Sequence, residues 1–153
     1  MPNVRKAIDI EQEVAHGLAK ELGILRRWLD AVGTKMGAGE VHRLDEYNDF
    51  DYLVLREENG FPLCYLEIKS RRASILKYGD CILPMRKVEA AQKLALTHSI
   101  GSYCVTEYGD GNLVEVDLNH HPASVKNIRR KDRPGTAAVP HAVYSKSQMR
   151  LIG

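Results

Sequence analysis

The sequence predicts an α/β domain built around one mixed sheet, and three observations indicate it. The chain has 153 residues, of which 44% are hydrophobic and 27% charged, a composition typical of a single domain with its own core. A helical segment precedes a strand hairpin, and a second helical segment separates that hairpin from two further strands. Because a helix connects the hairpin to the next strand, we expect those two strands to be parallel neighbours.

The first long segment, residues 7 to 32, is expected to form one or two helices. Its apolar residues share one face at 100° per residue. They are Ile8, Val14, Ala15, Leu18, Leu22 and Leu25. Glu11 falls within this stripe, where it is either a functional acid or an ordinary acid favoured near a helix start. Residues 33 to 50 contain turn formers and acids, and residues 40 to 44 could form a short strand.

The clearest elements are the two strands of the hairpin. Residues 51 to 56 (DYLVLR) and 63 to 69 (LCYLEIK) are rich in β-branched, aromatic and leucine residues, and an Asn-Gly pair lies between them. Opposed residues should have numbers that sum to about 119. A sum of 118 would place Asp51 on the same face as Glu67 and Lys69, because side chains alternate along a strand.

The remaining elements follow the hairpin in order. Residues 84 to 98 predict a helix, with a proline at its start and a glycine soon after its end. Residues 102 to 108 and 112 to 118 predict two strands joined by a tight Gly-Asp-Gly turn. Prolines interrupt the pattern beyond them, so only residues 142 to 144 and 148 to 152 are expected to form short terminal elements.

Charge is distributed unevenly along the chain. The net charge is +2, but residues 119 to 153 contain seven basic residues and one acid, which leaves −4 for residues 1 to 118. A basic segment is compatible with a polyanionic partner such as nucleic acid, although a solvated surface is the simpler alternative. We expect one domain over residues 1 to 153, with residues 119 to 153 as a basic C-terminal extension.

Neither export nor a disulfide framework is indicated. No apolar run reaches the roughly 20 residues that a membrane span needs, and the first residues lack the apolar core of a signal peptide. An intracellular location is therefore expected. The three cysteines, Cys64, Cys81 and Cys104, are far apart and show no C-x-x-C spacing, so reduced, packed thiols are expected.

Three ionisable side chains, those of Asp51, Glu67 and Lys69, converge if the numbers of opposed residues sum to 118. Asp51 and Glu67 would repel each other unless a cation lies between them, and hard oxygen ligands of this kind suit Mg²⁺. A lysine beside them, Lys69, could stabilise a hydroxide nucleophile or the charge that develops on a phosphate. These parts fit metal-assisted phosphodiester hydrolysis. A solvated Glu/Lys pair on a strand edge is the alternative, and Asp49 is a rival for Asp51.

Asp51, followed after fifteen residues by Glu67-Ile68-Lys69, resembles the motif of the PD-(D/E)xK nuclease superfamily. The resemblance covers roughly residues 7 to 118. It implies a restriction-endonuclease-like fold, in which a mixed central sheet is flanked by helices in an αβββαβ core. The helix after the hairpin also resembles that of Holliday-junction resolvases and related phage nucleases.

The resemblance further implies roles for individual residues. Asp51, Glu67 and the Ile68 carbonyl would bind Mg²⁺, with Mn²⁺ as a substitute, while Lys69 assists the attacking water and Glu11 supplies a further acid. Two positions depart from the pattern. Phe50 stands where proline is common, and a leucine stands four residues after Gln92, where RecB-like nucleases have tyrosine. The second departure leaves the subfamily open.

Several polar residues are candidates for DNA contacts because they follow the catalytic strand or belong to the basic segment. They are Arg71, Arg72, Lys87, Gln92, Arg129, Arg130 and Lys131. Each basic residue could instead be an ordinary surface charge, and Gln92 could make a buried structural hydrogen bond.

The function expected from the sequence is a Mg²⁺-dependent DNA endonuclease. It is expected to be a homodimer, since small nucleases of this type usually need two active sites to cut two strands. The alternative is a nucleic-acid-binding module that keeps the fold without turnover. The pattern leaves open whether the substrate is a branched junction, a specific site or a free end, and whether it is DNA or RNA.

Overall fold

A computed structural model describes residues 17–76, 80–129, 135 and 137–153. Its central sheet has six strands in the order β1-β2-β3-β5-β6-β9. The strands are β1 (Ala38–Arg43), β2 (Tyr52–Arg56), β3 (Pro62–Ser70), β5 (Gly101–Glu107), β6 (Leu113–Asp117) and β9 (Arg150–Leu151). The sheet is mixed, because β3 and β5 are parallel whereas the other neighbours are antiparallel. This arrangement confirms the predicted α/β class and the parallel pair around the second helix.

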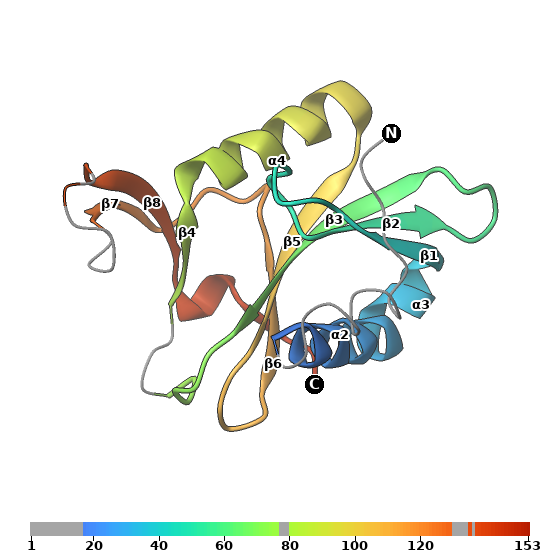
Figure 1. Cartoon of the computed structure of the whole chain (residues 1–153), viewed down its shortest axis with the longest axis horizontal. Coiled ribbons are helices and arrows are strands. Elements are labelled where there is room, and N and C mark those ends of the chain that lie inside the picture. Colours follow the sequence, from blue (N-terminus) through green and yellow to red (C-terminus); the bar gives the residue numbers. More distant parts are fainter. Residues whose placement is uncertain (1–16, 77–79, 130–134, 136) are drawn as a thin grey trace.

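Helices cover both faces of this sheet (Figure 1). On one face lie α2 (Gly17–Trp28), the π-helical turn η1 (Leu29–Gly33) and α3 (Thr34–Met36). On the other lies α4 (Met85–His98), which connects the hairpin region to β5. Two apolar clusters separate the helices from the sheet, one around Trp28 and one around Val88. The helical stripe predicted from the sequence is buried where the structure describes it.

A second sheet of three strands was not predicted. It has the order β4-β8-β7, formed by β4 (Cys81–Pro84), β8 (Val139–Tyr144) and β7 (Ser124–Ile128). Figure 1 shows β7 and β8 extending away from the central sheet, next to β4. The residues of β7 are mostly exposed, so the strand lacks the apolar alternation by which strands are recognised in a sequence. The basic C-terminal segment thus contributes strands to the fold, and β8 contributes Ala142 and Tyr144 to the core.

The hairpin of β2 and β3 has the register that the sequence analysis required. Tyr52 lies opposite Leu66 and Val54 opposite Cys64, so that paired numbers sum to 118. The register shifts between Val54 and Leu55, because Leu55 pairs with Pro62. Continued one step beyond Tyr52, this pairing sets Asp51 opposite Glu67.

All three cysteines are buried and free, in agreement with the prediction. Cys81 in β4 and Cys104 in β5 approach each other, with a distance of 3.6 Å between their sulfur atoms. No helix in the part of the chain that the structure describes is long and apolar enough to cross a membrane.

Candidate active site

Asp51 lies at the end of the hairpin and is fixed by its backbone and its side chain. Its amide donates to the Leu66 carbonyl at 2.9 Å, and its carbonyl accepts from the Leu44 amide at 2.8 Å. The Oδ2 atom of its side chain accepts a hydrogen bond from the Ile68 amide at 2.8 Å. The Asp51 carboxylate is therefore bound to β3 beside the position of Glu67.

Glu67 is buried and has a lysine as partner. Its side chain is 10% exposed, and Lys87 Nζ lies 2.7 Å from its Oε2 atom. Burial and the neighbouring Asp51 carboxylate raise the pKa of Glu67, against the opposing effect of Lys87 and Lys69. The Asp51 carboxylate thus lies close enough to Glu67 to raise its pKa, which agrees with the register that sets the two residues opposite each other.

Lys69 lies two residues after Glu67 on β3, so both side chains point to the same face of the sheet. Its Nζ atom donates to the Ile82 carbonyl of β4 at 3.0 Å. The three-stranded sheet therefore positions the lysine of the E-x-K motif. Because Lys69 also contributes to the electrostatics of Glu67, its ammonium group lies within the field of the carboxylate pair.

A further acid near the carboxylate pair, Glu21 of α2, was not predicted from the sequence. Its side chain is 16% exposed, and its Oε1 atom lies 3.5 Å from Arg43 Nη1. Burial and, next, the Asp51 carboxylate raise the pKa of Glu21 to about 7; Glu67 contributes in the same direction and Arg43 opposes it. The predicted further acid, Glu11, lies outside the described residues.

A signal for Glu21 was present in the sequence. It lies three residues after Leu18 and four residues before Leu25, both of which are buried. An acid at these spacings shares the buried face of its helix. Glu11 was predicted as a site residue on the same ground, because it falls within the earlier part of this apolar stripe.

Two carboxylates, those of Asp51 and Glu67, could hold a divalent cation at this site. Within the described residues, no group of three or more His, Cys, Asp or Glu side chains could hold a metal ion. Mg²⁺ commonly binds through one or two carboxylates and keeps several waters. Asp51 and Glu67 match that requirement. The Ile68 carbonyl points to the same side of β3 as its amide, which bonds Asp51, and so toward the same site.

The other residues predicted to contact DNA differ in how exposed they are, and two of them lie outside the described residues. Arg71 is half-buried, and its Nε atom has no hydrogen-bond partner among the described residues. Arg72 and Arg129 are exposed and Gln92 is half-buried, whereas Arg130 and Lys131 lie outside the described residues.

Asp49, the rival of Asp51, forms an ion pair with Arg86 at 2.8 Å and is 41% exposed. This pair occupies Asp49 on the surface, whereas Asp51 is the acid bound to β3.

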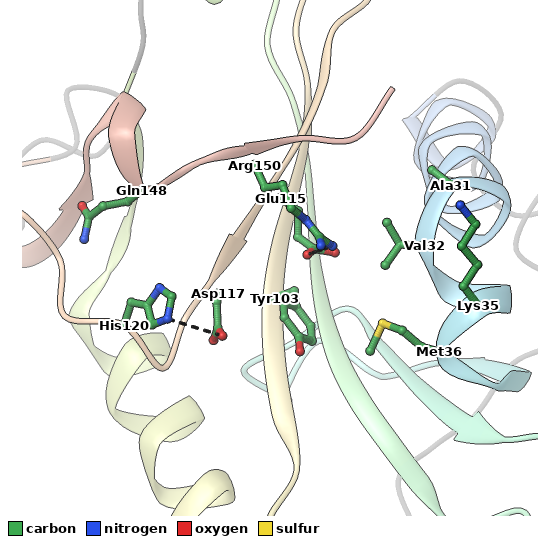
Figure 2. A pocket seen from close by; sticks show the side chains of 10 residues that line it. All are labelled: Ala31, Val32, Lys35, Met36, Tyr103, Glu115, Asp117, His120, Gln148 and Arg150. Carbon is green, nitrogen blue, oxygen red and sulfur yellow. Dashed lines mark hydrogen bonds and ion pairs between the residues drawn. The ribbon is translucent and has the colours of Figure 1, made fainter.

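A cavity of about 660 Å³ lies elsewhere, between η1 and α3 on one side and β5 and β6 on the other. Figure 2 shows Glu115 and Arg150 next to each other on its wall, and Asp117 joined to His120. Both oxygens of Glu115 are engaged, by Trp28 Nε1 at 2.6 Å and by Arg150 Nη2 at 2.7 Å. The buried carboxylate of Glu115 is therefore satisfied by hydrogen bonds within the protein.

Comparisons with known proteins connect these residues to a family. The family model described as "Phage putative PDDEXK endonuclease" matches residues 10–144. A solved structure of Hjc, a Holliday junction resolvase from Archaeoglobus fulgidus, is similar with a TM-score of 0.47 and 14% identity, over 84% of this chain and 85% of that chain. No curated protein sequence matches the chain. Because the family model spans most of the chain, including Asp51, Glu67 and Lys69, this protein belongs to the PD-(D/E)xK nucleases.

Proposed function

We propose that this nuclease is a Mg²⁺-dependent DNA endonuclease that hydrolyses phosphodiester bonds, with Mn²⁺ as a substitute. The observation that supports this proposal is the hairpin register, which brings Asp51 and Glu67 together and leaves Lys69 on the same face. Paired carboxylates beside a lysine match the needs of phosphodiester hydrolysis, in which a divalent cation and an ammonium group stabilise developing negative charge.

Each residue has a distinct role in this proposal. Asp51, Glu67 and the Ile68 carbonyl would hold the cation, which when bound supplies an activated water and neutralises phosphate charge. Lys69, whose ammonium group donates to the Ile82 carbonyl, would assist the attacking water and stabilise charge in the transition state. Glu21 is proposed as a further acid of the site, a role that the sequence also predicts for Glu11, which lies outside the described residues. The Glu21 pKa of about 7 suits exchange of a proton near neutral pH.

DNA is the proposed substrate, and exposed basic residues on the loop after β3 and at the end of β7 support it. Arg72 is the second residue after β3, and Arg129 directly follows β7. A homodimer is proposed because two strands need two active sites; sedimentation equilibrium would measure its mass.

The free, buried cysteines favour a reducing compartment and hence an intracellular location.

The decisive experiment is a cleavage assay on supercoiled plasmid, a four-way junction and single-stranded DNA, with Mg²⁺, with Mn²⁺ or with EDTA. We expect cleavage with either metal and none with EDTA, and the three substrates together identify the preferred DNA structure. Lys69→Met should stop cleavage while Mg²⁺ still binds, because its role is at the nucleophile and not at the metal. DNA binding without metal-dependent cleavage would replace this proposal with the alternative, a binding module that keeps the fold.

A further inference from the structure

Lys87 occupies a position that is unusual for a lysine on a helix surface. It belongs to the first turn of α4, and its side chain is only 15% exposed. Its Nζ atom lies 2.7 Å from Glu67 Oε2. Lys93, on the same helix, is exposed, as is usual for a lysine. The position of Lys87 therefore differs from that of a simple surface contact for DNA.

The ammonium group of Lys87 compensates a charge that would otherwise be costly. Glu67 is buried next to the Asp51 carboxylate, and an unpaired buried carboxylate destabilises a fold. Among the described residues, Lys87 is the hydrogen-bond partner of the Glu67 side chain. Lys69 is directed to the Ile82 carbonyl instead. Lys87 thus supplies the counter-charge that lies in direct contact with the Glu67 carboxylate.

A divalent cation that binds Glu67 must come close to this ammonium group. Two cations that share one carboxylate repel each other, and this repulsion is stronger in a partly buried site than in water. Lys87 therefore opposes metal binding as long as it stays on Glu67. A phosphate group of the substrate is negatively charged, as the Glu67 carboxylate is, and so offers the Lys87 ammonium group an alternative partner.

We propose that Lys87 is an internal competitor of the divalent cation, so that Mg²⁺ binds tightly only when a phosphodiester withdraws Lys87 from Glu67. This inference rests on the proposed function, because it concerns the same metal site. It adds a regulatory property to that site: metal binding and DNA binding strengthen each other, and the reciprocity is a thermodynamic requirement.

The test measures Mg²⁺ affinity by isothermal titration calorimetry, without DNA and with a non-cleavable phosphorothioate duplex. Without DNA, Lys87→Gln should bind Mg²⁺ about tenfold more tightly than the wild type, because the opposing charge is gone. Lys87→Arg, which keeps the charge, and Lys93→Gln, the matched control on α4, should stay within about twofold. The duplex should tighten Mg²⁺ binding in the wild type far more than in Lys87→Gln.

A second measurement tests the same pair without metal. In EDTA, Lys87→Gln should lower the melting temperature, because Glu67 loses its counter-ion, whereas Lys93→Gln should not. If Lys87→Gln does not fold, Lys87→Met serves as the neutral variant in both measurements.

Equal or weaker Mg²⁺ binding by the neutral variant would overturn the inference and make Lys87 a residue that only positions Glu67. This outcome is distinguishable from failure of the proposed function. If Asp51→Asn and Glu67→Gln leave Mg²⁺ affinity unchanged, the metal site itself is wrong. If those two variants abolish Mg²⁺ binding but Lys87→Gln does not tighten it, only the competition is wrong.

Discussion

Two buried acids on opposite faces of the same sheet show how differently this protein treats a carboxylate. Glu115 on β6 is 6% exposed, and both its oxygens are bonded, one by a buried indole and one by a guanidinium. Glu67 on β3 is 8% exposed when the whole residue is counted. It has one ammonium partner and lies beside a second carboxylate. Burial alone thus does not identify a functional acid. What distinguishes Glu67 from Glu115 is the second carboxylate beside it, that of Asp51.

The largest expected effect separates the two acids by activity. Asp51→Asn or Glu67→Gln should reduce metal-dependent cleavage by about 10³-fold or more, because each removes a proposed ligand of the cation. DNA binding, measured by fluorescence anisotropy in EDTA, should be retained or strengthened since a repulsion against phosphate is lost. Asp49→Asn, which affects only the surface pair with Arg86, is the matched control. Wild-type rates for Asp51→Asn would refute the assignment.

The reverse separation is expected for the structural acid. Glu115→Ala leaves the Trp28 indole buried without an acceptor, which should lower the free energy of unfolding by about 2–3 kcal/mol. Urea denaturation measures this loss, with the exposed Glu58→Ala as control. Cleavage per folded molecule should stay within about twofold. A stable Glu115→Ala protein with lost cleavage would mean that the cavity in Figure 2 takes part in function.

A smaller effect concerns pH and the acid with a raised pKa. The pKa of Glu21 is about 7 in the fold and about 4.5 when unperturbed, so the folded state favours its protonated form. Its carboxyl group therefore destabilises the fold progressively as pH rises from about 4.5 to about 7, and by a constant amount above.

Glu21→Gln removes that penalty. In EDTA, the variant should be more stable than the wild type by about 1–2 kcal/mol at pH 8, after allowance for solvent screening at a partly exposed group. The difference should vanish near pH 4.5. Thermal unfolding over this pH range measures it, and a variant less stable at pH 8 would show that the ion pair with Arg43 dominates.

The smallest expected effect tests which face of the sheet receives DNA. DNA binding should weaken steeply with salt. A plot of the logarithm of the binding constant against the logarithm of the salt concentration should have a slope of several units if several phosphates are contacted. Arg129→Ala, which changes the residue directly after β7, should reduce the slope by about 1. Lys35→Ala, which changes the cavity beside Glu115, should leave it unchanged. Equal changes in both variants would contradict a DNA surface confined to the side of Glu67.

The sequence was informative wherever local pattern and chemistry coincide. The strand hairpin followed from alternation and an Asn-Gly turn, but its register was expected only to within about one residue. The structure has the even sum of 118 next to Asp51, and this register sets Asp51 opposite Glu67. Glu21 was harder to recognise, because the helical stripe contains more than one acid and the sequence does not show where the helix meets β3. The partner of Glu67 was also out of reach, since Lys87 arrives from twenty residues away.

The three-stranded sheet escaped prediction for a different physical reason. β7 is exposed on both faces, so that backbone pairing with β8 holds it in place, and not an apolar side. β4 is four residues long and ends at the proline before α4. Neither segment shows the periodicity from which strands are predicted.

The shift of register between Val54 and Leu55 has a consequence for how this gene can change over generations. Between the turn and the shift, paired numbers sum to 117; beyond it they sum to 118, and Asp51 belongs to the second set. A pairing that slips by one residue turns a strand's side chains to the opposite face. A one-codon insertion or deletion within the paired residues between the irregularity and Asp51 would therefore turn Asp51 away from the face of Glu67 unless a second change at the irregularity restored the pairing, whereas a change in the turn alters only the loop. Lineages of this protein should therefore vary the turn in length more freely than this paired segment.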